Sequence, residues 1–138
     1  RNYITNMNSL IRNRKKVRQV IDFTGVQNGN MHPSDIDAVL EFDNDVLILI
    51  EVKYKFRKIP TGQRLLLERL CDSWHTKKSI VLKVEHDFDS DEENIPLDKC
   101  KVTAIYYGKK WIYYTEHYDF KHYINKLGEK WECKKCKF

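Results

Sequence analysis

The sequence predicts an α/β fold in which a mixed β-sheet is flanked by helices. Two neighbouring segments, 35–42 and 46–55, carry apolar residues at their even positions, an alternation typical of strands. In 2–21 and after Pro60, apolar residues recur instead at helical spacing. The predicted order is α-β-β-α-β followed by a C-terminal hairpin and helix, which indicates helices packed on a shared sheet.

Each predicted element has a local signal. The first helix, 2–21, has an apolar stripe that ends at Ile21, and a turn-rich segment from Phe23 to Ser34 follows it. Pro60 marks the start of a second helix, since proline is tolerated in the first helical turn. Three further elements are expected: a strand at 79–85, a hairpin of 100–107 and 110–115, and a helix at 118–127.

The composition bounds the class of protein. With 138 residues, 41% of them hydrophobic, the chain is long enough for a core, and we expect one domain over 1–138 whose last residues, 128–138, form a basic tail. The net charge of +5 favours a polyanionic partner, nucleic acid before membrane. No apolar run approaches the ~20 residues of a membrane-spanning helix. The four cysteines are too few for a disulfide scaffold, which favours the cytoplasm.

The hairpin at 35–55 has one fully apolar face and one face with charges. The turn signal Asp43-Asn44-Asp45 predicts a loop centred on Asn44, so that opposed residue numbers sum to 88. Asp37 then faces Glu51. A slip of one residue would mismatch the apolar face, whereas a slip of two would place Asp35 opposite Glu51.

Two opposed carboxylates in a sheet call for a compensating charge. Their Cβ atoms would lie ~5 Å apart, where like charges destabilise the pairing. A divalent cation resolves the conflict, and oxygen ligands favour Mg²⁺, with Mn²⁺ as a substitute. Lys53 points to the same face as Glu51 and could orient an attacking water. This combination suits metal-assisted phosphodiester hydrolysis.

Asp37 followed across a hairpin by Glu51-Val52-Lys53 resembles the signature of the PD-(D/E)XK nuclease superfamily. The stretch "SDIDAVLEFDNDVLILIEVK" is similar to the versions in small Holliday-junction resolvases and related phage or archaeal nucleases. The resemblance covers roughly 35–74. It implies a restriction-endonuclease-like core and a Mg²⁺-dependent DNA endonuclease that acts on branched DNA in recombination or repair.

The resemblance also implies roles for individual residues. Asp37 and Glu51 would be metal ligands, the backbone carbonyl of Val52 a further ligand, and Lys53 the catalytic lysine. Gln63 matches a glutamine found near the site in several subfamilies. The chain departs from the pattern because Ser34 separates Pro33 from Asp35 and because no acid precedes Asp22. A third carboxylate would have to come from Asp35 or Glu41, or be missing.

Two groups of cations are candidate DNA contacts, since each phosphate contact adds salt-sensitive affinity. One group lies in the first predicted helix and the other just after the motif strand: Arg12, Lys15 and Lys16, then Lys55, Arg57 and Lys58. Duplex or branched substrates usually need two active sites, so a homodimer is expected by analogy.

Two other interpretations stay open. A non-catalytic nucleic-acid-binding module could retain a nuclease-like fold. Cys133 and Cys136 form half of a zinc site that His117 and His122 could complete, but half a site is weak evidence, and Zn²⁺ is not expected there. The aromatic residues of the last hairpin could stack on bases, although filling the core is the expected role: Tyr106, Tyr107, Trp111, Tyr113 and Tyr114.

Overall fold

The computed structural model describes residues 20–89 and 94–138. The chain divides after Ser34 into two units, and the described part of the first, 20–34, consists of turns and a bridge between Asn28 and Met31. The predicted first helix lies outside the described residues except for Val20 and Ile21. Both are exposed and not helical, so the predicted helix end at Ile21 is wrong. A single domain over 1–138 stays a prediction.

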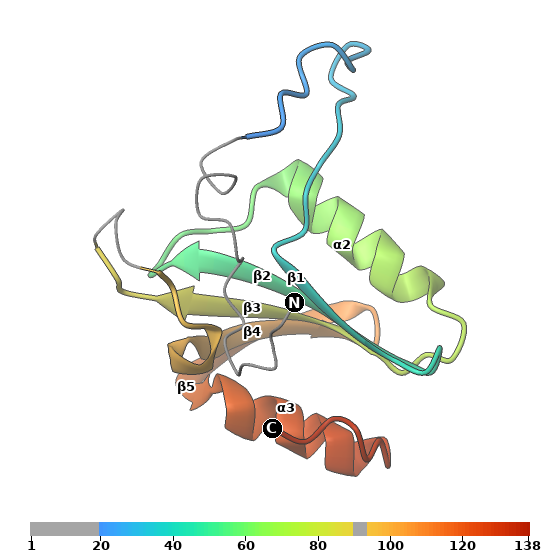
Figure 1. Cartoon of the computed structure of the whole chain (residues 1–138), viewed down its shortest axis with the longest axis vertical. Coiled ribbons are helices and arrows are strands. Elements are labelled where there is room, and N and C mark those ends of the chain that lie inside the picture. Colours follow the sequence, from blue (N-terminus) through green and yellow to red (C-terminus); the bar gives the residue numbers. More distant parts are fainter. Residues whose placement is uncertain (1–19, 90–93) are drawn as a thin grey trace, which may run out of the picture. The chain divides into compact units, whose positions relative to one another are not determined.

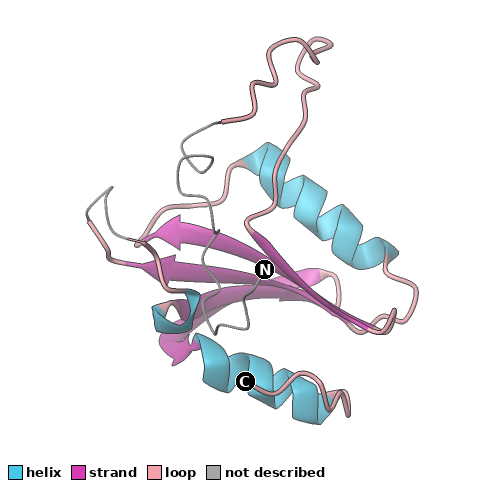
Figure 2. Cartoon of the chain, in the orientation of Figure 1, coloured by secondary structure: helices cyan, strands magenta, loops and turns pink. Residues whose placement is uncertain are grey.

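The second unit, 35–138, is a five-stranded mixed sheet with one helix on each face (Figures 1 and 2). The strand order β1-β2-β3-β4-β5 follows the chain, and only the β2–β3 pair is parallel. This confirms the mixed α/β class. Its elements are β1 Ala38–Phe42, β2 Val46–Tyr54, α2 Thr61–Ser73, β3 Ser79–His86, a 3₁₀ turn Leu97–Lys99, β4 Lys101–Tyr107, β5 Lys110–Asp119 and α3 Phe120–Lys130.

The β1–β2 hairpin has the register that the sequence predicts. Glu41 pairs with Leu47 and Ala38 with Ile50, so opposed numbers sum to 88. Asp43 and Asn44 both take positive φ, 53° and 59°, which these residue types tolerate in hairpin turns. The predicted strand at 35–42 is too long, however, because the ladder begins at Ala38.

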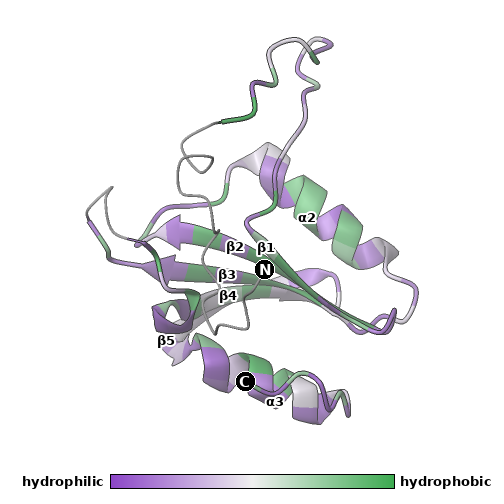
Figure 3. Ribbon diagram, viewed as in Figure 1, coloured by the Kyte–Doolittle hydropathy of each residue, from purple (hydrophilic) through white to green (hydrophobic). Residues whose placement is uncertain are grey.

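Alternation along the strands creates two apolar layers. Even-numbered residues of the hairpin, such as Ile48 and Ile50, pack with Ile124 and Leu127 of α3. Leu47 and Leu49 pack with Leu67 and Cys71 on the α2 side, where Figure 3 shows apolar positions recurring along the helix. Neither α2 nor α3 is long and apolar enough to cross a membrane.

Ile36 departs from the predicted pattern. Parity assigns it to the face with Ile48, but it packs against the α2-side cluster. The alternation holds only within a ladder, and Ile36 precedes the first paired residue of β1. On α2, helical spacing places Leu70 on the same face as Leu67, yet Leu70 is 38% exposed whereas Leu67 is buried.

Side-chain hydrogen bonds fix α2 on the sheet. The Tyr106 hydroxyl donates to Asp72 at 2.9 Å, and the Trp111 indole donates to Glu68 at 2.6 Å. Tyr106 is buried, as the core role expected, whereas Tyr113 is 70% exposed. The helix is therefore held over Leu47, Leu49 and Val81 at one end, and its first turn lies near the charged end of β2.

The C-terminal residues pack on α3. Trp131 and Cys136 are buried, and the Cys136 thiol donates to the carbonyl oxygen of Ile124 at 3.1 Å. A Cβ atom at Gly128 would collide with the Cys136 carbonyl oxygen. The predicted basic tail is thus partly core, because only a residue without a side chain permits this close approach.

The two helical glycines offer a matched test of this packing. Gly128→Ala should lower the free energy of unfolding by ~1–3 kcal/mol, because overpacking outweighs alanine's helix propensity. Gly62→Ala, in open space on α2, should leave it unchanged or raise it by up to ~1 kcal/mol. Urea denaturation measures both. Equal effects of the two substitutions would contradict the packing of residues 131–138 on α3.

Candidate functional site

Glu51 is a buried carboxylate near the end of β2. Its side chain is 1% exposed, because β2 lies between β1 and β3 and α2 covers this face. Lys53 approaches the Glu51 Oε2 atom at 2.8 Å, while Oε1 is buried and has no hydrogen-bond partner within the described residues. An unsatisfied buried carboxylate oxygen is costly unless a proton or a cation meets it.

Asp37 approaches Glu51 from the position just before β1. It lies one residue before the Ala38–Ile50 pair, so continuation of the register brings it opposite Glu51. The backbone N–H of Val52 donates to Asp37 Oδ2 at 2.8 Å, and this bond fixes the exposed carboxylate against β2. The other oxygen, Oδ1, accepts no hydrogen bond within the described residues.

Lys53 and Gln63 complete the cluster. The Lys53 ammonium donates to Gln63 Oε1 at 3.4 Å as well as pairing with Glu51, and its side chain is 21% exposed. Gln63 lies in the first turn of α2, so the loop after β2 folds back over the strand end. Lys53 is therefore aimed at the carboxylates rather than at solvent.

The electrostatics of Glu51 agree with this geometry. Burial raises the pKa of Glu51, the hydrogen bond from Lys53 lowers it, and the charge of Asp37 raises it again, with a net upward direction. Within the described residues, each of these two carboxylates has one oxygen that is paired and one that has no protein donor. Such a pair fits a hard divalent cation. Mg²⁺ commonly binds through one or two carboxylates with waters and phosphates as its other ligands.

The other two carboxylates predicted for the site, Asp35 and Glu41, do not join Asp37 and Glu51 in the same way. Asp35 is exposed and precedes β1, and Lys53 pairs with Glu51 rather than with Asp35. Glu41 Oε2 accepts the Asn44 N–H at 2.7 Å at the hairpin turn, ~13 Å along the strand from Asp37, so it is no third carboxylate for this site. The part of the chain that the structure describes holds no group of three or more His, Cys, Asp or Glu placed for a metal. A metal here would depend on two carboxylates; Val52 as a ligand stays a prediction.

Strand β3 adds charged residues that the sequence interpretation missed. In the parallel register Glu51 pairs with Lys83 and Lys53 with Glu85, which alternates the signs of the charges across the two strands. Lys83 and Glu85 form an ion pair of 2.8 Å, and the Thr103 hydroxyl donates to Glu85 at 3.0 Å. The sequence contains a signal for this arrangement. The segment "VLKVE" on β3 has the same spacing of charged residues as "LIEVK" on β2, with the acid and the lysine in the opposite order.

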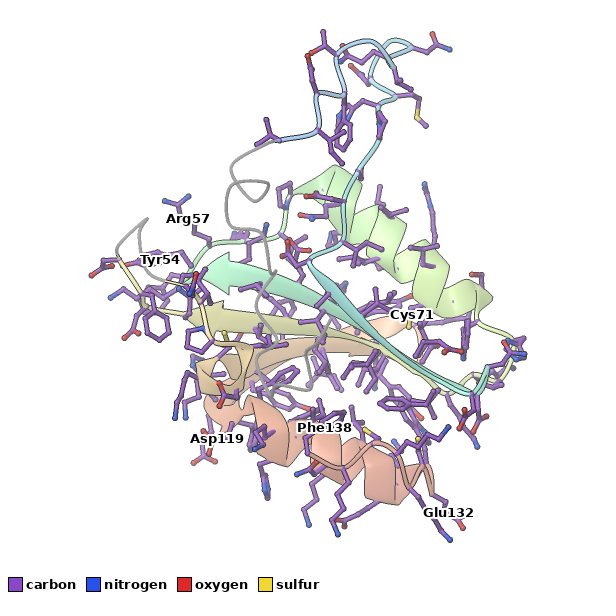
Figure 4. All side chains as sticks on the ribbon, in the orientation of Figure 1. Tyr54, Arg57, Cys71, Asp119, Glu132 and Phe138 are labelled. Atoms are coloured by element: carbon purple, nitrogen blue, oxygen red, sulfur yellow. The ribbon has the colours of Figure 1, made fainter. Side chains whose placement is uncertain are left out.

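The structure describes only one of the two groups of cations predicted to contact DNA. Lys55, Arg57 and Lys58 are exposed in the loop after β2, directly beyond the carboxylates. Figure 4 shows Tyr54 and Arg57 together at this end of β2, and the guanidinium of Arg57 lies 5.9 Å from the Tyr54 ring centre. Arg12, Lys15 and Lys16 lie outside the described residues.

The C-terminal cysteines do not join the predicted histidines. His117 and His122 are exposed, Cys136 is buried in the packing under α3, and all four cysteines are free thiols. The Cys136 thiol donates a hydrogen bond to the Ile124 carbonyl oxygen, whereas Cys133 is only partly buried. Zn²⁺ at Cys133 and Cys136 has no third ligand among the residues described.

Comparison of the chain with protein-family models, with curated proteins and with solved structures gave no match. The interpretation of the site therefore depends on the geometry of its own residues.

The raised pKa of Glu51 makes a signed prediction about metal-free stability. The folded state binds this proton more tightly than the unfolded state, so the contribution of Glu51 to stability falls as pH rises above its ordinary value of 4.5. Glu51→Gln removes the titration. The variant should thus gain stability relative to the wild type between acidic and neutral pH, measured by urea denaturation in EDTA.

Glu68 offers a control of opposite sign. The Trp111 hydrogen bond lowers its pKa, so its contribution is lost as pH falls below 4.5. Glu68→Gln should therefore lose stability relative to the wild type as pH rises through that range. Parallel pH profiles for Glu51→Gln and the wild type would contradict the burial of an ionisable Glu51.

Proposed function

We propose that this protein is a Mg²⁺-dependent deoxyribonuclease of the PD-(D/E)XK type. The observation that supports the proposal most strongly is the pair Asp37 and Glu51 beside a lysine held between Glu51 and Gln63. Each of the two carboxylates has one oxygen without a donor among the residues that the structure describes. A buried carboxylate beside a second negative charge is costly, and binding a cation is the function that best explains the Asp37–Glu51 pair.

Asp37 and Glu51 would hold the cation, which when bound polarises a phosphoryl oxygen and lowers the pKa of water. Lys53 is close enough to Glu51 to reach a water or phosphate oxygen at the same place, and its charge stabilises negative charge that develops on the phosphate. Gln63 positions Lys53. Lys55, Arg57 and Lys58 would bind the backbone of the strand just beyond the scissile phosphate.

The restriction-endonuclease-like core belongs to this proposal, since it supplies the parallel β2–β3 pair that brings the charged strand ends together. A junction or other branched DNA remains the substrate suggested by the likeness of 34–53 to small resolvases.

A second candidate, a non-catalytic nucleic-acid-binding module, is favoured by one observation. Within the described residues the cluster offers two carboxylates and no third His, Cys, Asp or Glu. Such a module would bind DNA in EDTA through the cationic loop and would cleave no substrate. It leaves the cost of the Asp37–Glu51 pair unexplained.

Substitutions at the cluster should abolish cleavage without unfolding the chain. Asp37→Asn and Glu51→Gln should each remove Mg²⁺- and Mn²⁺-dependent cleavage of junction, flap, duplex and single-stranded DNA, and Lys53→Met should slow it by ~10²-fold or more. Glu41→Gln, at the other end of the hairpin, should cut at the wild-type rate.

Gel assays of all variants, with circular dichroism to confirm folding, provide the measurement. Undiminished cleavage by both Asp37→Asn and Glu51→Gln would exclude the assignment. Tight DNA binding by the wild type with no cleavage of any of the four substrates would favour the binding module.

A further inference from the structure

An exposed aromatic residue lies in the middle of the cationic loop. Phe56 is 82% exposed, and Lys55, Arg57 and Lys58 surround it in the sequence. Single exposed apolar side chains are common on protein surfaces. What distinguishes Phe56 is the way its backbone is held and the place where it is held.

The backbone of Phe56 is fixed in an unfavourable conformation. Its φ is +66°, in the left-handed region that a bulky side chain rarely adopts. The N–H of Phe56 donates to Glu85 Oε1 at 3.0 Å, that of Lys55 to the His86 carbonyl at 2.9 Å and that of Arg57 to the Tyr54 carbonyl at 3.0 Å. Three successive N–H groups of the loop are thus committed.

Glu85 is a firm anchor for this turn. Its side chain is 11% exposed, it pairs with Lys83 at 2.8 Å, and it accepts the Thr103 hydroxyl. Because Glu85 is also the strand partner of Lys53, one residue links the turn to the candidate catalytic lysine. A nearly buried carboxylate thus holds the positive φ of Phe56 in place and keeps its exposed ring at this position.

The neighbouring aromatic residue, Tyr54, is engaged in contacts within the protein. The Tyr54 hydroxyl donates to Asp89, and its ring contacts His86 edge-on with ring centres 5.6 Å apart. Asp89 would also repel a phosphate on that side. The Tyr54 side chain is therefore already engaged by its own contacts, whereas the exposed ring of Phe56 is open to a nucleic-acid base.

We propose that Phe56 stacks on an unpaired base of the strand whose phosphate lies at Asp37 and Glu51. A ring face stacks on any base, and the flanking cations bind the phosphates on either side. Phe56 follows Lys53 by three residues, at most ~10 Å of chain, or about three base steps of ~3.4 Å. The favoured substrates are single-stranded, flap or junction DNA with unpaired bases beside the cut. This inference rests on the proposed nuclease function.

The test measures DNA binding by the full chain in EDTA, by fluorescence anisotropy. Phe56→Leu keeps an apolar side chain without a ring face and should weaken binding to single-stranded and flap DNA by ~10-fold, with binding to continuous duplex unchanged. Phe56→Trp should retain the wild-type affinity. Tyr113→Ala, which removes an exposed aromatic residue from β5, is the matched control and should have no effect.

Phe56→Gly separates stacking from folding. It removes the ring and relieves the positive φ, so the affinity should fall while the unfolding midpoint stays the same or rises. In the wild type, photocrosslinking with 5-iododeoxyuridine within about three nucleotides of the cut should map to Phe56 by mass spectrometry.

Equal losses on duplex and single-stranded DNA with Phe56→Leu, or no loss, would overturn the inference. A change of oligomeric state in place of a change of affinity would also overturn it, because Phe56 would then contact a second copy of the chain. If the wild type cuts DNA and Phe56→Leu binds normally, only this inference fails. If Phe56-dependent binding occurs without cleavage under Mg²⁺ or Mn²⁺, only the nuclease assignment fails.

Discussion

Burial of Glu51 is the constraint on which the site depends. The residue lies on a central strand, 1% exposed, between a neighbour that presents Asp37 and a neighbour that presents Lys83. Lys53 satisfies one of its oxygens and the other has no protein donor within the described residues. An ionised carboxylate in this position lowers the free energy of unfolding near neutral pH.

The same strand ends organise the surrounding surface. Because β2 and β3 are parallel, their charged ends lie at one edge of the sheet, and the loop to α2 leaves from that edge. Gln63 returns toward Lys53 at the start of α2, while Glu85 holds the loop at Phe56. The proposed cleavage site and the proposed base contact are thus built from one pair of strands.

Local patterns predicted part of this arrangement. The parity of 36–52 and the turn at Asn44 specified the hairpin register, since a slip of one residue would turn apolar side chains to the wrong face. The same patterns assigned Ile36 to the wrong face, because the ladder has not yet begun there. They also gave no sign that Glu85 would hold the loop at Phe56. That role depends on which strand pairs with β2 and in what register, a non-local choice that hydrophobic periodicity does not encode. The predicted helix end at Ile21 was wrong because an apolar stripe does not mark where a helix stops.

Binding of Mn²⁺ to the metal-free chain tests the central claim most directly. Titration followed by electron paramagnetic resonance should show a single Mn²⁺ site from which Mg²⁺ displaces the ion. Asp37→Asn and Glu51→Gln should each abolish that site, whereas Glu41→Gln should retain it. Equal Mn²⁺ binding by the wild type and all three variants, or no binding by the wild type, would contradict the account.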